Sequence, residues 1–284
     1  MNRCSIIANK EVVFIFPLDY TFGHDGLLYK HTVTDAPPCD AYSMHTHNLY
    51  EVLYFISGDA THVIEDRKYK LKKGDLILIR PSKYHFIQID SSVRYERYDI
   101  LFSDRHVEQM GGIAVPQDIE VINLPSGSVA DGIFKRMDYY SENLDEKGFY
   151  DVLRLLIGEL FFCISINVKN EAGADFSVIS PLLSKALSYI NDNLFSIKNI
   201  SDVAAALFVS ESYLFRLFKN ELKQSPKRYI LNKRLLAAQN LLAAGEGASK
   251  VYEKCGFGDY TAFYRSYKSL FGYAPSEEKK GPRP

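Results

Sequence analysis

The chain has 284 residues, 46% hydrophobic and 24% charged, which is enough for two globular domains that each bury a core. No apolar run reaches the ~18 residues of a membrane span, and the N-terminus lacks the length and cleavage site of a secretory signal. Four scattered cysteines without CxxC spacing favour reduced thiols over a disulfide framework. We therefore expect a cytoplasmic protein that does not enter a membrane.

Charge is distributed unevenly along the chain. The formal net charge is -1, but residues 1–174 hold 18 Lys and Arg against 25 Asp and Glu, whereas residues 175–284 hold 16 against 10. An acidic part joined to a basic part indicates that only the C-terminal part meets a polyanion. Chance segregation on two solvated surfaces is the alternative.

From about residue 12 to residue 102, short runs of alternating apolar and polar residues are separated by turn signals. Examples of such runs are Glu51–Ile56, Thr61–Ile64 and Leu76–Ile79, each next to a turn rich in Gly, Asp or Ser. Short strands with regular punctuation are typical of an antiparallel sandwich or barrel. We assign this fold to residues 1–128.

Residues 129–168 change to a helical period with a break near Asn143, which predicts a helical hairpin. The second helix carries an apolar stripe that consists of Leu153, Leu156, Leu160 and Ile164. This stripe would pack either against a helix of a second copy or against the chain's own barrel. The polar residues 169–179 are predicted to be a linker.

Residues 180–284 are helical in pattern and contain an internal repeat. Ser210 and Asp259 are good helix N-caps, and similar residues recur at equal offsets after each. The matched pairs are Leu214 and Phe263, Arg216 and Arg265, Phe218 and Tyr267, Lys219 and Lys268, Leu222 and Phe271, and Pro226 and Pro275. A short helix and a tight turn precede each cap, which predicts two helix-turn-helix units. A long helix from Pro226 to Ala243 would hold them for successive major grooves of double-stranded DNA, about 34 Å apart.

From about residue 180 to residue 278, the amino-acid sequence resembles the AraC/XylS family of bacterial transcription regulators. The resemblance rests on Ser210–Lys219, Arg234–Leu242, Cys255–Phe257 and Phe263–Lys268, with Gly272 and Pro275 following. Three positions depart from the family pattern: Phe208 where a glycine is usual, Tyr252 where a small alanine is usual, and Ala262 where an aromatic residue is frequent. The first two bear on how the helices pack.

The resemblance also implies which side chains contact DNA. The groove-facing positions are Ser212, Phe215 and Arg216 in the first unit and Tyr260, Thr261, Tyr264 and Arg265 in the second. A guanidinium can contact guanine in a bidentate manner, and aromatic faces suit thymine methyl groups. Phosphate contacts are expected for Lys219, Lys268, Lys233 and Arg234, with a structural ion pair as the alternative for Arg234 and a solvated charge for the lysines.

A second set of residues lies in the N-terminal part. His45, His47 and Glu51, followed by Gly58, have the spacing of the first cupin motif, and the stretch from Gly74 to His85 resembles the second. Alternation along a strand would place His45, His47 and Glu51 on one face. His85 could complete a site of three histidines and one carboxylate, a donor set that binds Fe, Mn, Ni or Zn.

Three interpretations of this site are open: a metal-dependent enzyme, a bound divalent metal without catalysis, and a small-molecule pocket without metal. We favour the third, with no catalytic residue and no required cofactor. A histidine in a small barrel more often lines a pocket and makes hydrogen bonds than coordinates a metal. The predicted effector pocket comprises His45, His47, Glu51, Tyr54 and His85.

The sequence thus predicts an α+β protein of two domains: an antiparallel jelly-roll or cupin barrel followed by a helical hairpin, and an all-α domain with two helix-turn-helix units. The expected function is transcription regulation in response to a small molecule. The resemblance favours a carbohydrate effector, a homodimer formed through the hairpin, and a contact with RNA polymerase. A regulator that binds DNA independently of any effector is the alternative.

Overall fold

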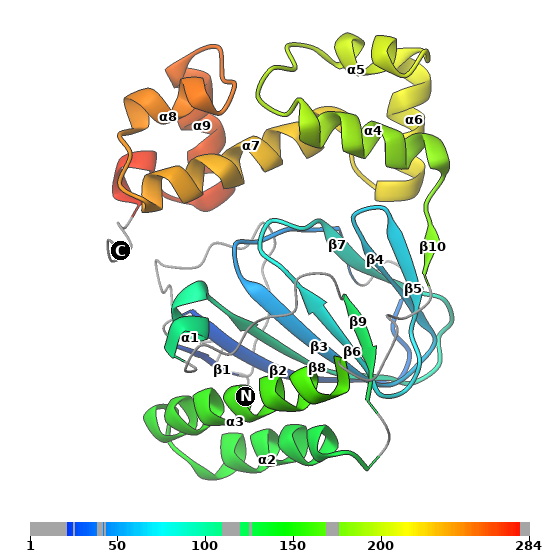
Figure 1. Cartoon of the computed structure of the whole chain (residues 1–284), viewed down its shortest axis with the longest axis vertical. Helices are drawn as coiled ribbons and strands as arrows, with labels where there is room; N and C mark the ends of the chain where they lie inside the picture. Colours follow the sequence, from blue (N-terminus) through cyan, green and yellow to red (C-terminus); the bar gives the residue numbers. More distant parts are fainter. Residues whose placement is uncertain are drawn as a thin grey trace.

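The computed structural model describes residues 22–24, 26–38, 42, 44–109, 120–124, 127–168 and 176–278. The β-strands form two sheets, a helical hairpin lies below them, and a helical domain lies above (Figure 1). The strand pattern predicted from residue 12 falls outside the described residues as far as residue 21.

Two antiparallel sheets make up the N-terminal domain. The larger sheet has the order β1 (Phe22–His24), β2 (Leu27–Thr34), β8 (Tyr95–Phe102), β3 (Tyr50–Ser57), β6 (Asp75–Ile79) and β9 (Val121–Asn123). The smaller sheet has the order β10 (Ser177–Val178), β5 (Arg67–Lys70), β4 (Ala60–Ile64) and β7 (His85–Ile89). Side chains of both sheets, such as Leu53 of β3 and Ile87 of β7, share one buried cluster, so the sheets face each other. The predicted antiparallel fold is confirmed.

The helical hairpin covers the outer face of the larger sheet. Its helices are α2 (Val129–Asn143) and α3 (Glu146–Val168), while the short helix α1 (Asp104–Gln109) follows β8. The predicted apolar stripe of α3 is buried in one cluster with strand residues such as Tyr98 and Phe102. Burial of each leucine in that stripe contributes about 1.5–3 kcal/mol. Of the two alternatives for this stripe, the structure therefore shows packing on the chain's own barrel.

The linker predicted over residues 169–179 is partly structured. Residues 169–175 lie outside the described residues, but β10 pairs antiparallel with β5, with Val178 opposite Arg67. The amide of Ile179 also donates to the carbonyl oxygen of Asp66 at 2.9 Å. The end of the linker is therefore held on the edge of the barrel.

The C-terminal domain has the predicted helical order. Its helices are α4 (Pro181–Asp192), α5 (Ile200–Ala206), α6 (Glu211–Leu222), α7 (Pro226–Ala243), α8 (Ala248–Lys254), α9 (Tyr260–Phe271) and the 3₁₀ turn η1 (Pro275–Glu277). The side chains of Ser180, Ser210, Ser225 and Asp259 each accept a hydrogen bond from a backbone amide three residues later. These caps fix where each helix begins, as the sequence predicts.

Helix α7 is shared by two small cores. Tyr229 and Ile230, near its beginning, pack with the first helix-turn-helix unit, whereas Leu235 and Leu242 pack with the second. Between them, the guanidinium of Arg234 donates to the carbonyl oxygens of Leu194, Ile197 and Gly256 at 2.8, 2.5 and 2.8 Å. The phosphate contact and the ion pair considered for Arg234 are therefore both wrong, because its donors join the two units.

The turns of the two helix-turn-helix units differ at the position where Phe208 replaces the usual glycine. Phe208 has a φ of 56° and is 96% exposed, whereas Gly256 has a φ of 76° at the corresponding place after α8. A left-handed conformation costs a non-glycine residue about 1 kcal/mol, so Phe208 is accommodated at the expense of some stability. Tyr252 packs its ring 5.7 Å from that of Tyr260 and so contacts the beginning of α9.

None of the helices in the described part of the chain combines the length and hydropathy that crossing a bilayer requires.

We expect Gly256→Ala to lower the free energy of unfolding by about 2 kcal/mol, because the residue has a positive φ and the new Cβ would lie 2.5 Å from the carbonyl oxygen of Phe195. Chemical denaturation of the full chain measures this. Gly258→Ala is the control, since no atom lies within 4 Å of its Cβ position. Equal effects of the two substitutions would contradict the assignment of strain to Gly256.

Candidate functional site

Four residues predicted from the cupin motifs converge at one end of the barrel. One ligand atom from each of His45, His47, Glu51 and His85 lies within 4.8 Å of the others. Glu51 is in β3 of the larger sheet and His85 is in β7 of the smaller one. His45 exchanges two backbone hydrogen bonds of 3.0 Å with His85, so it precedes β3 and is not part of that strand. The four residues therefore meet where the ends of the two sheets come together.

Hydrogen-bond partners determine which ring nitrogens carry protons. Nδ1 of His47 lies 3.1 Å from the carbonyl oxygen of Leu49, and Nδ1 of His85 lies 3.0 Å from that of Lys83. A carbonyl oxygen only accepts, so each Nδ1 carries the hydrogen and each neutral ring has a lone pair on Nε2. Both Nε2 atoms face Oε2 of Glu51, at 2.9 and 3.0 Å. A carboxylate oxygen also accepts, so either extra protons or a cation must lie between these atoms.

Burial and the hydrogen bonds of the cluster act on the pKa values of His47 and Glu51 in opposite directions. Desolvation lowers the pKa of His47, although its hydrogen bond to Glu51 acts in the opposite direction. Desolvation raises the pKa of Glu51, but the charge of His85 and the hydrogen bonds of both imidazoles hold that pKa well below its usual range. Three imidazoles and one carboxylate are a donor set that fits a divalent transition metal.

Three further polar residues in the barrel interior were missed by the sequence analysis. His62 lies with its ring centroid 6.0 Å from that of His85, and burial lowers its pKa to about 3. Arg97 Nε donates to Asp99 at 2.7 Å, and burial raises the pKa of that carboxyl to about 6. Within the described part of the chain, Nδ1 of His62 and Oδ1 of Asp99 have no hydrogen-bond partner, so the interior offers polar atoms to a ligand. Alternation in β4 and β8 is the sequence signal that could have located these residues.

The prediction that Tyr54 lines the pocket is wrong. Its ring stacks on that of Phe134 in α2 at 4.5 Å, and its hydroxyl donates to Asp131. Successive residues of a strand point to opposite faces, so Glu51 faces the interior and Tyr54 faces the hairpin. The prediction placed Tyr54 near the histidines from sequence proximity alone.

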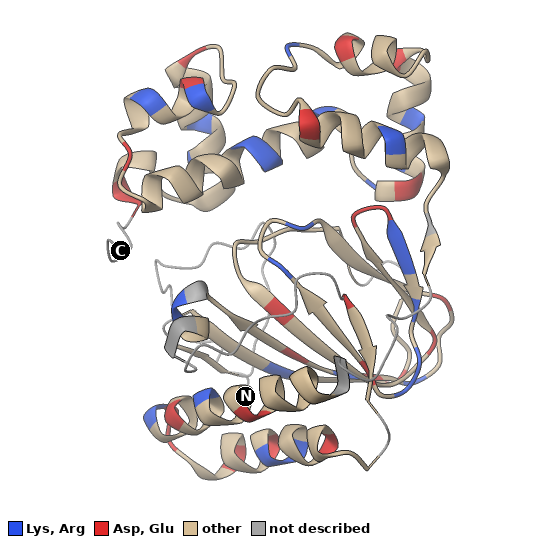
Figure 2. Ribbon diagram, in the orientation of Figure 1, with Lys and Arg blue, Asp and Glu red and all other residues tan. Residues whose placement is uncertain are grey.

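The helical domain contacts the barrel directly above the histidine cluster. Nζ of Lys233 in α7 donates to Oε1 of Glu65 at 2.6 Å and to the carbonyl oxygen of Ser82 at 3.0 Å. The hydroxyl of Tyr229 donates to Oε2 of Glu65 at 2.7 Å, and its ring stacks on that of Tyr84 at 4.5 Å. Figure 2 shows the acidic turn between β4 and β5 at the top of the barrel, next to the helical domain. The phosphate contact predicted for Lys233 is therefore wrong.

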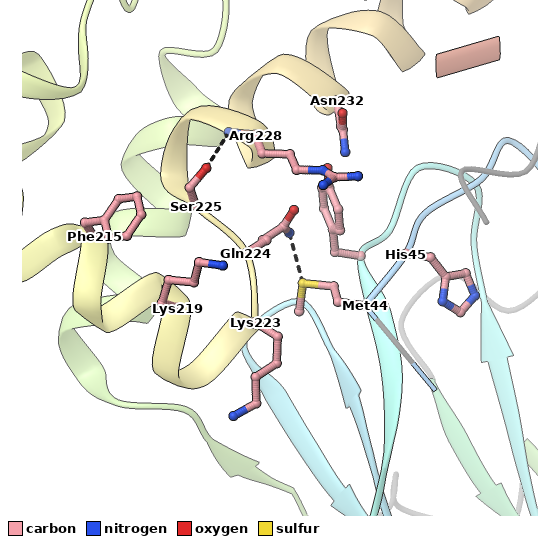
Figure 3. Close-up of a pocket in the computed structure, with 10 residues that line it drawn as sticks. Met44, His45, Phe215, Lys219, Lys223, Gln224, Ser225, Arg228 and Asn232 are labelled. Atoms are coloured by element: carbon pink, nitrogen blue, oxygen red, sulfur yellow. Dashed lines mark hydrogen bonds between the residues drawn. The ribbon is translucent and has the colours of Figure 1, made fainter. Parts of the chain in front are cut away.

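A cavity of about 500 Å³ lies between the two domains (Figure 3). That volume is in the range of small-molecule sites. Its wall is formed by Met44, His45 and Tyr84 of the barrel and by Phe215, Lys219, Lys223, Gln224, Ser225, Arg228 and Asn232 of the helical domain. His45 thus belongs both to the four-residue cluster and to this cavity.

The predicted DNA contacts lie on the exposed sides of α6 and α9. Ser212, Phe215, Arg216 and Lys219 are exposed on α6; Tyr260, Thr261, Arg265 and Lys268 are exposed on α9, where Tyr264 is half-buried. The repeat positions Leu214 and Phe263 are fully buried, so each recognition helix presents a separate polar and aromatic face to solvent.

Comparisons with known proteins agree with both halves of this architecture. Residues 33–122 match the family model described as AraC-like ligand binding domain, and residues 203–281 match the one described as helix-turn-helix domain. The chain belongs to the AraC family of transcription regulators. It is therefore an AraC-type regulator with an N-terminal ligand-binding domain and a C-terminal helix-turn-helix domain.

Similar proteins match this AraC-type chain over most of its length. It is 23% identical over 281 residues to the raffinose operon transcriptional regulatory protein RafR of Pediococcus pentosaceus, covering 91% of this chain and 92% of RafR. It is 23% identical over 254 residues to the HTH-type transcriptional activator RhaS of Klebsiella pneumoniae, covering 86% and 90%. A solved structure of ToxT from Vibrio cholerae superposes with a TM-score of 0.37 at 14% identity, covering 89% of this chain and 97% of ToxT.

We expect Arg265→Ala to weaken binding to the specific operator by about 1–3 kcal/mol and to relax the preference at one base pair, because it removes the predicted bidentate base contact. Lys268→Ala should weaken binding to all sequences alike and reduce the salt dependence of log K by about one unit. Fluorescence anisotropy over a salt series measures both. Uniform weakening by Arg265→Ala would refute its assignment as a base contact.

Proposed function

We propose that this AraC-type regulator binds a small effector where the barrel meets the helical domain and thereby changes its binding to promoter DNA. The observation that carries the proposal is the shared cavity, because residues of both domains form its wall. A ligand there would contact the barrel and helix α6 together. It could therefore have different affinities for two arrangements of the domains, which is what an allosteric effector requires.

We propose a carbohydrate as the class of effector. One relative supports this, because it is named as the regulatory protein of a raffinose operon. The proposed pocket reaches from the shared cavity, whose wall includes His45, to His47, Glu51 and His85 of the cluster. The unpartnered atoms of His62 and Asp99 are available there to hydroxyl groups. A hydroxyl both donates and accepts, so it can satisfy an imidazole nitrogen and a carboxylate oxygen at once.

We propose that the chain has no enzymatic activity and acts in the cytoplasm. The relatives described above are named as transcription regulators, which supports a regulatory role for the barrel. A metal-dependent enzyme is the alternative, and it would show turnover that His47→Ala abolishes without loss of DNA binding. Because RhaS is named an activator, we also propose that the DNA-bound chain contacts RNA polymerase.

The first test is a titration of the purified chain against its own upstream promoter DNA, with and without a panel of sugars. We expect binding in low salt that one sugar strengthens or relocates. Binding that no sugar alters would overturn the carbohydrate proposal and leave an effector of another class, or none. No binding to any promoter fragment would contradict DNA recognition by α6 and α9.

We propose that the chain forms a homodimer through the outer face of α3. Leu155, Phe162 and Ile166 are 74%, 60% and 62% exposed and follow one another at helical spacing. Three large apolar side chains on one exposed face favour contact with another surface. This stripe differs from the predicted one, which is buried against the barrel. A dimer would bring four helix-turn-helix units to paired half-sites and so raise the effective concentration of the second domain.

We expect the double substitution Leu155→Glu and Phe162→Glu to convert the dimer to a monomer, because four buried carboxylates would face each other across the two-fold axis. Sedimentation velocity measures the change in mass. Tyr139→Glu is the matched control, since Tyr139 of α2 is 61% exposed but lies outside the stripe. A double variant that sediments like the unmodified chain would show that α3 does not form the interface.

A further inference from the structure

The two helix-turn-helix units have separate buried cores. Residues of the first core, such as Leu187 and Phe218, share no cluster with residues of the second, such as Val251 and Tyr267. Each core includes part of α7, so apolar packing holds each unit to this helix and not to the other unit. The relative position of α6 and α9 then depends on the stiffness of α7 and on direct contact between the units.

The units touch directly beside the middle of α7. Figure 1 shows the loop before α5 and the turn between α8 and α9 facing each other above this helix. A Cβ atom at Gly256, in that turn, would lie 2.5 Å from the carbonyl oxygen and 3.0 Å from the Cα atom of Phe195, in that loop. The two backbones therefore approach each other so closely that only a glycine fits between them.

Arg234 joins the two backbones at this point. Its Nε and Nη2 atoms donate to the carbonyl oxygens of Leu194 and Ile197 in the first unit, at 2.8 and 2.5 Å. Its Nη1 atom donates to the carbonyl oxygen of Gly256 in the second unit at 2.8 Å. We use the word joint for Arg234 together with the segment 193–197 and Gly256.

The acceptors of the joint are fixed in their own units. The carbonyl oxygen of Asn193 accepts hydrogen bonds from the amides of Ser196 and Ile197 at 3.0 and 3.1 Å, and the side chain of Ile197 is buried in the first core. The amide of Gly256 donates to the carbonyl oxygen of Glu253 in α8 at 2.9 Å. Movement of either set of carbonyl groups therefore requires movement of the unit that carries it.

The chemistry of Arg234 makes the joint stiff. A guanidinium is a planar group whose donors have fixed directions, so three hydrogen bonds restrain rotation as well as distance. The acceptors are backbone carbonyl groups, which lack the freedom of a carboxylate at the end of a flexible side chain. Burial lowers the pKa of Arg234, because the guanidinium is partly removed from water. Loss of these bonds would leave a partly desolvated charge without its acceptors.

We propose that Arg234 makes the two helix-turn-helix units one rigid body and so sets the spacing between the two operator segments that α6 and α9 contact. Arg234 is then a positioning residue, because it acts on DNA recognition without contacting DNA. The inference rests on DNA recognition by α6 and α9 and does not depend on an effector. Without the joint, the units are connected through α7, a single helix of 18 residues that can bend.

The spacing matters because DNA is helical. One base pair added between the two segments moves the second segment by about 3.4 Å along the axis and turns it by about 35°. A rigid body cannot follow this displacement and loses the base contacts of one unit. Two units with a flexible connection can follow it, but they lose more conformational freedom on binding and so bind the natural spacing less tightly.

The experiment measures binding of the purified full chain to its upstream promoter DNA by fluorescence anisotropy. Base-pair substitutions that cease to matter in Arg216→Ala or in Arg265→Ala locate the segments that α6 and α9 contact. Two further DNAs have one base pair added or removed between these segments. The readout is the spacing ratio, defined as the Kd for an altered DNA divided by the Kd for the natural DNA. For the unmodified chain we expect a spacing ratio of about 10 or more.

Arg234→Lys tests the joint with the charge retained. An ammonium group can donate to one unit but lacks the planar fork that reaches three carbonyl groups. We expect the Kd for the natural DNA to rise by about 2- to 10-fold and the spacing ratio to fall to about 2. Partial loss of folded protein would raise the Kd for all three DNAs alike and would leave the ratio unchanged. Arg234→Met removes every donor and should lower the ratio at least as far; if it does not fold, Arg234→Lys decides.

Gly256→Ala perturbs the joint without changing Arg234. The new Cβ would lie 2.5 Å from the carbonyl oxygen of Phe195 and 3.1 Å from Cζ of Arg234, so it separates the two backbones. We expect the same fall in the spacing ratio. Gly258→Ala and Lys185→Met are the matched controls, since no atom of another described segment lies within 4 Å of the Cβ position of Gly258, and Lys185 is an exposed cation of α4. Both should retain the ratio of the unmodified chain.

Two results would overturn the inference. A spacing ratio near 1 for the unmodified chain would show that the units do not act as one rigid body. A ratio that stays unchanged in both Arg234→Lys and Gly256→Ala would show that α7 alone sets the spacing. Neither result bears on the effector proposed above, whereas a chain that binds none of the DNAs would contradict DNA recognition by α6 and α9, and the inference with it.

Discussion

The arrangement of the two domains depends on the carboxylate of Glu65. This side chain accepts hydrogen bonds from the ammonium of Lys233, from the hydroxyl of Tyr229 and from the backbone amide of Tyr84. Two of these donors belong to α7 and one to the barrel, so a single group joins the sensor to the helix that carries both DNA-binding units. Burial makes these interactions stronger than they would be in water, and it also makes the loss of any one partner more costly.

The parts of the structure that could be predicted from the sequence are those with local signals. The caps at Ser210 and Asp259, the repeat that follows each and the periods of two and 3.6 residues all act within one or two turns of chain. The cupin spacing located His45, His47, Glu51 and His85, although it wrongly assumed one strand for the first three.

The remaining features depend on tertiary contacts that leave no local pattern. Lys233 looks like a surface cation in a basic helix, and its partner Glu65 is 168 residues away along the chain. Arg234 likewise gives no sign that its donors meet three backbone carbonyls. Tyr54 was misplaced because it was assigned by nearness to the histidines, when alternation from Glu51 already sends it to the opposite face.

The short strand β10 determines what kind of movement the DNA-binding domain can make. It is paired with the edge strand β5, and only Ile179 and Ser180 separate it from the first residue of α4. The three residue steps from Val178 to Pro181 span at most about 11 Å, so the start of α4 cannot leave the barrel while β10 stays paired. If the contacts of Glu65 with α7 broke, the helical domain would therefore rotate about β10 and would not diffuse freely. The same geometry keeps the separated surfaces close together, so reclosure is intramolecular and fast compared with the capture of an independent partner.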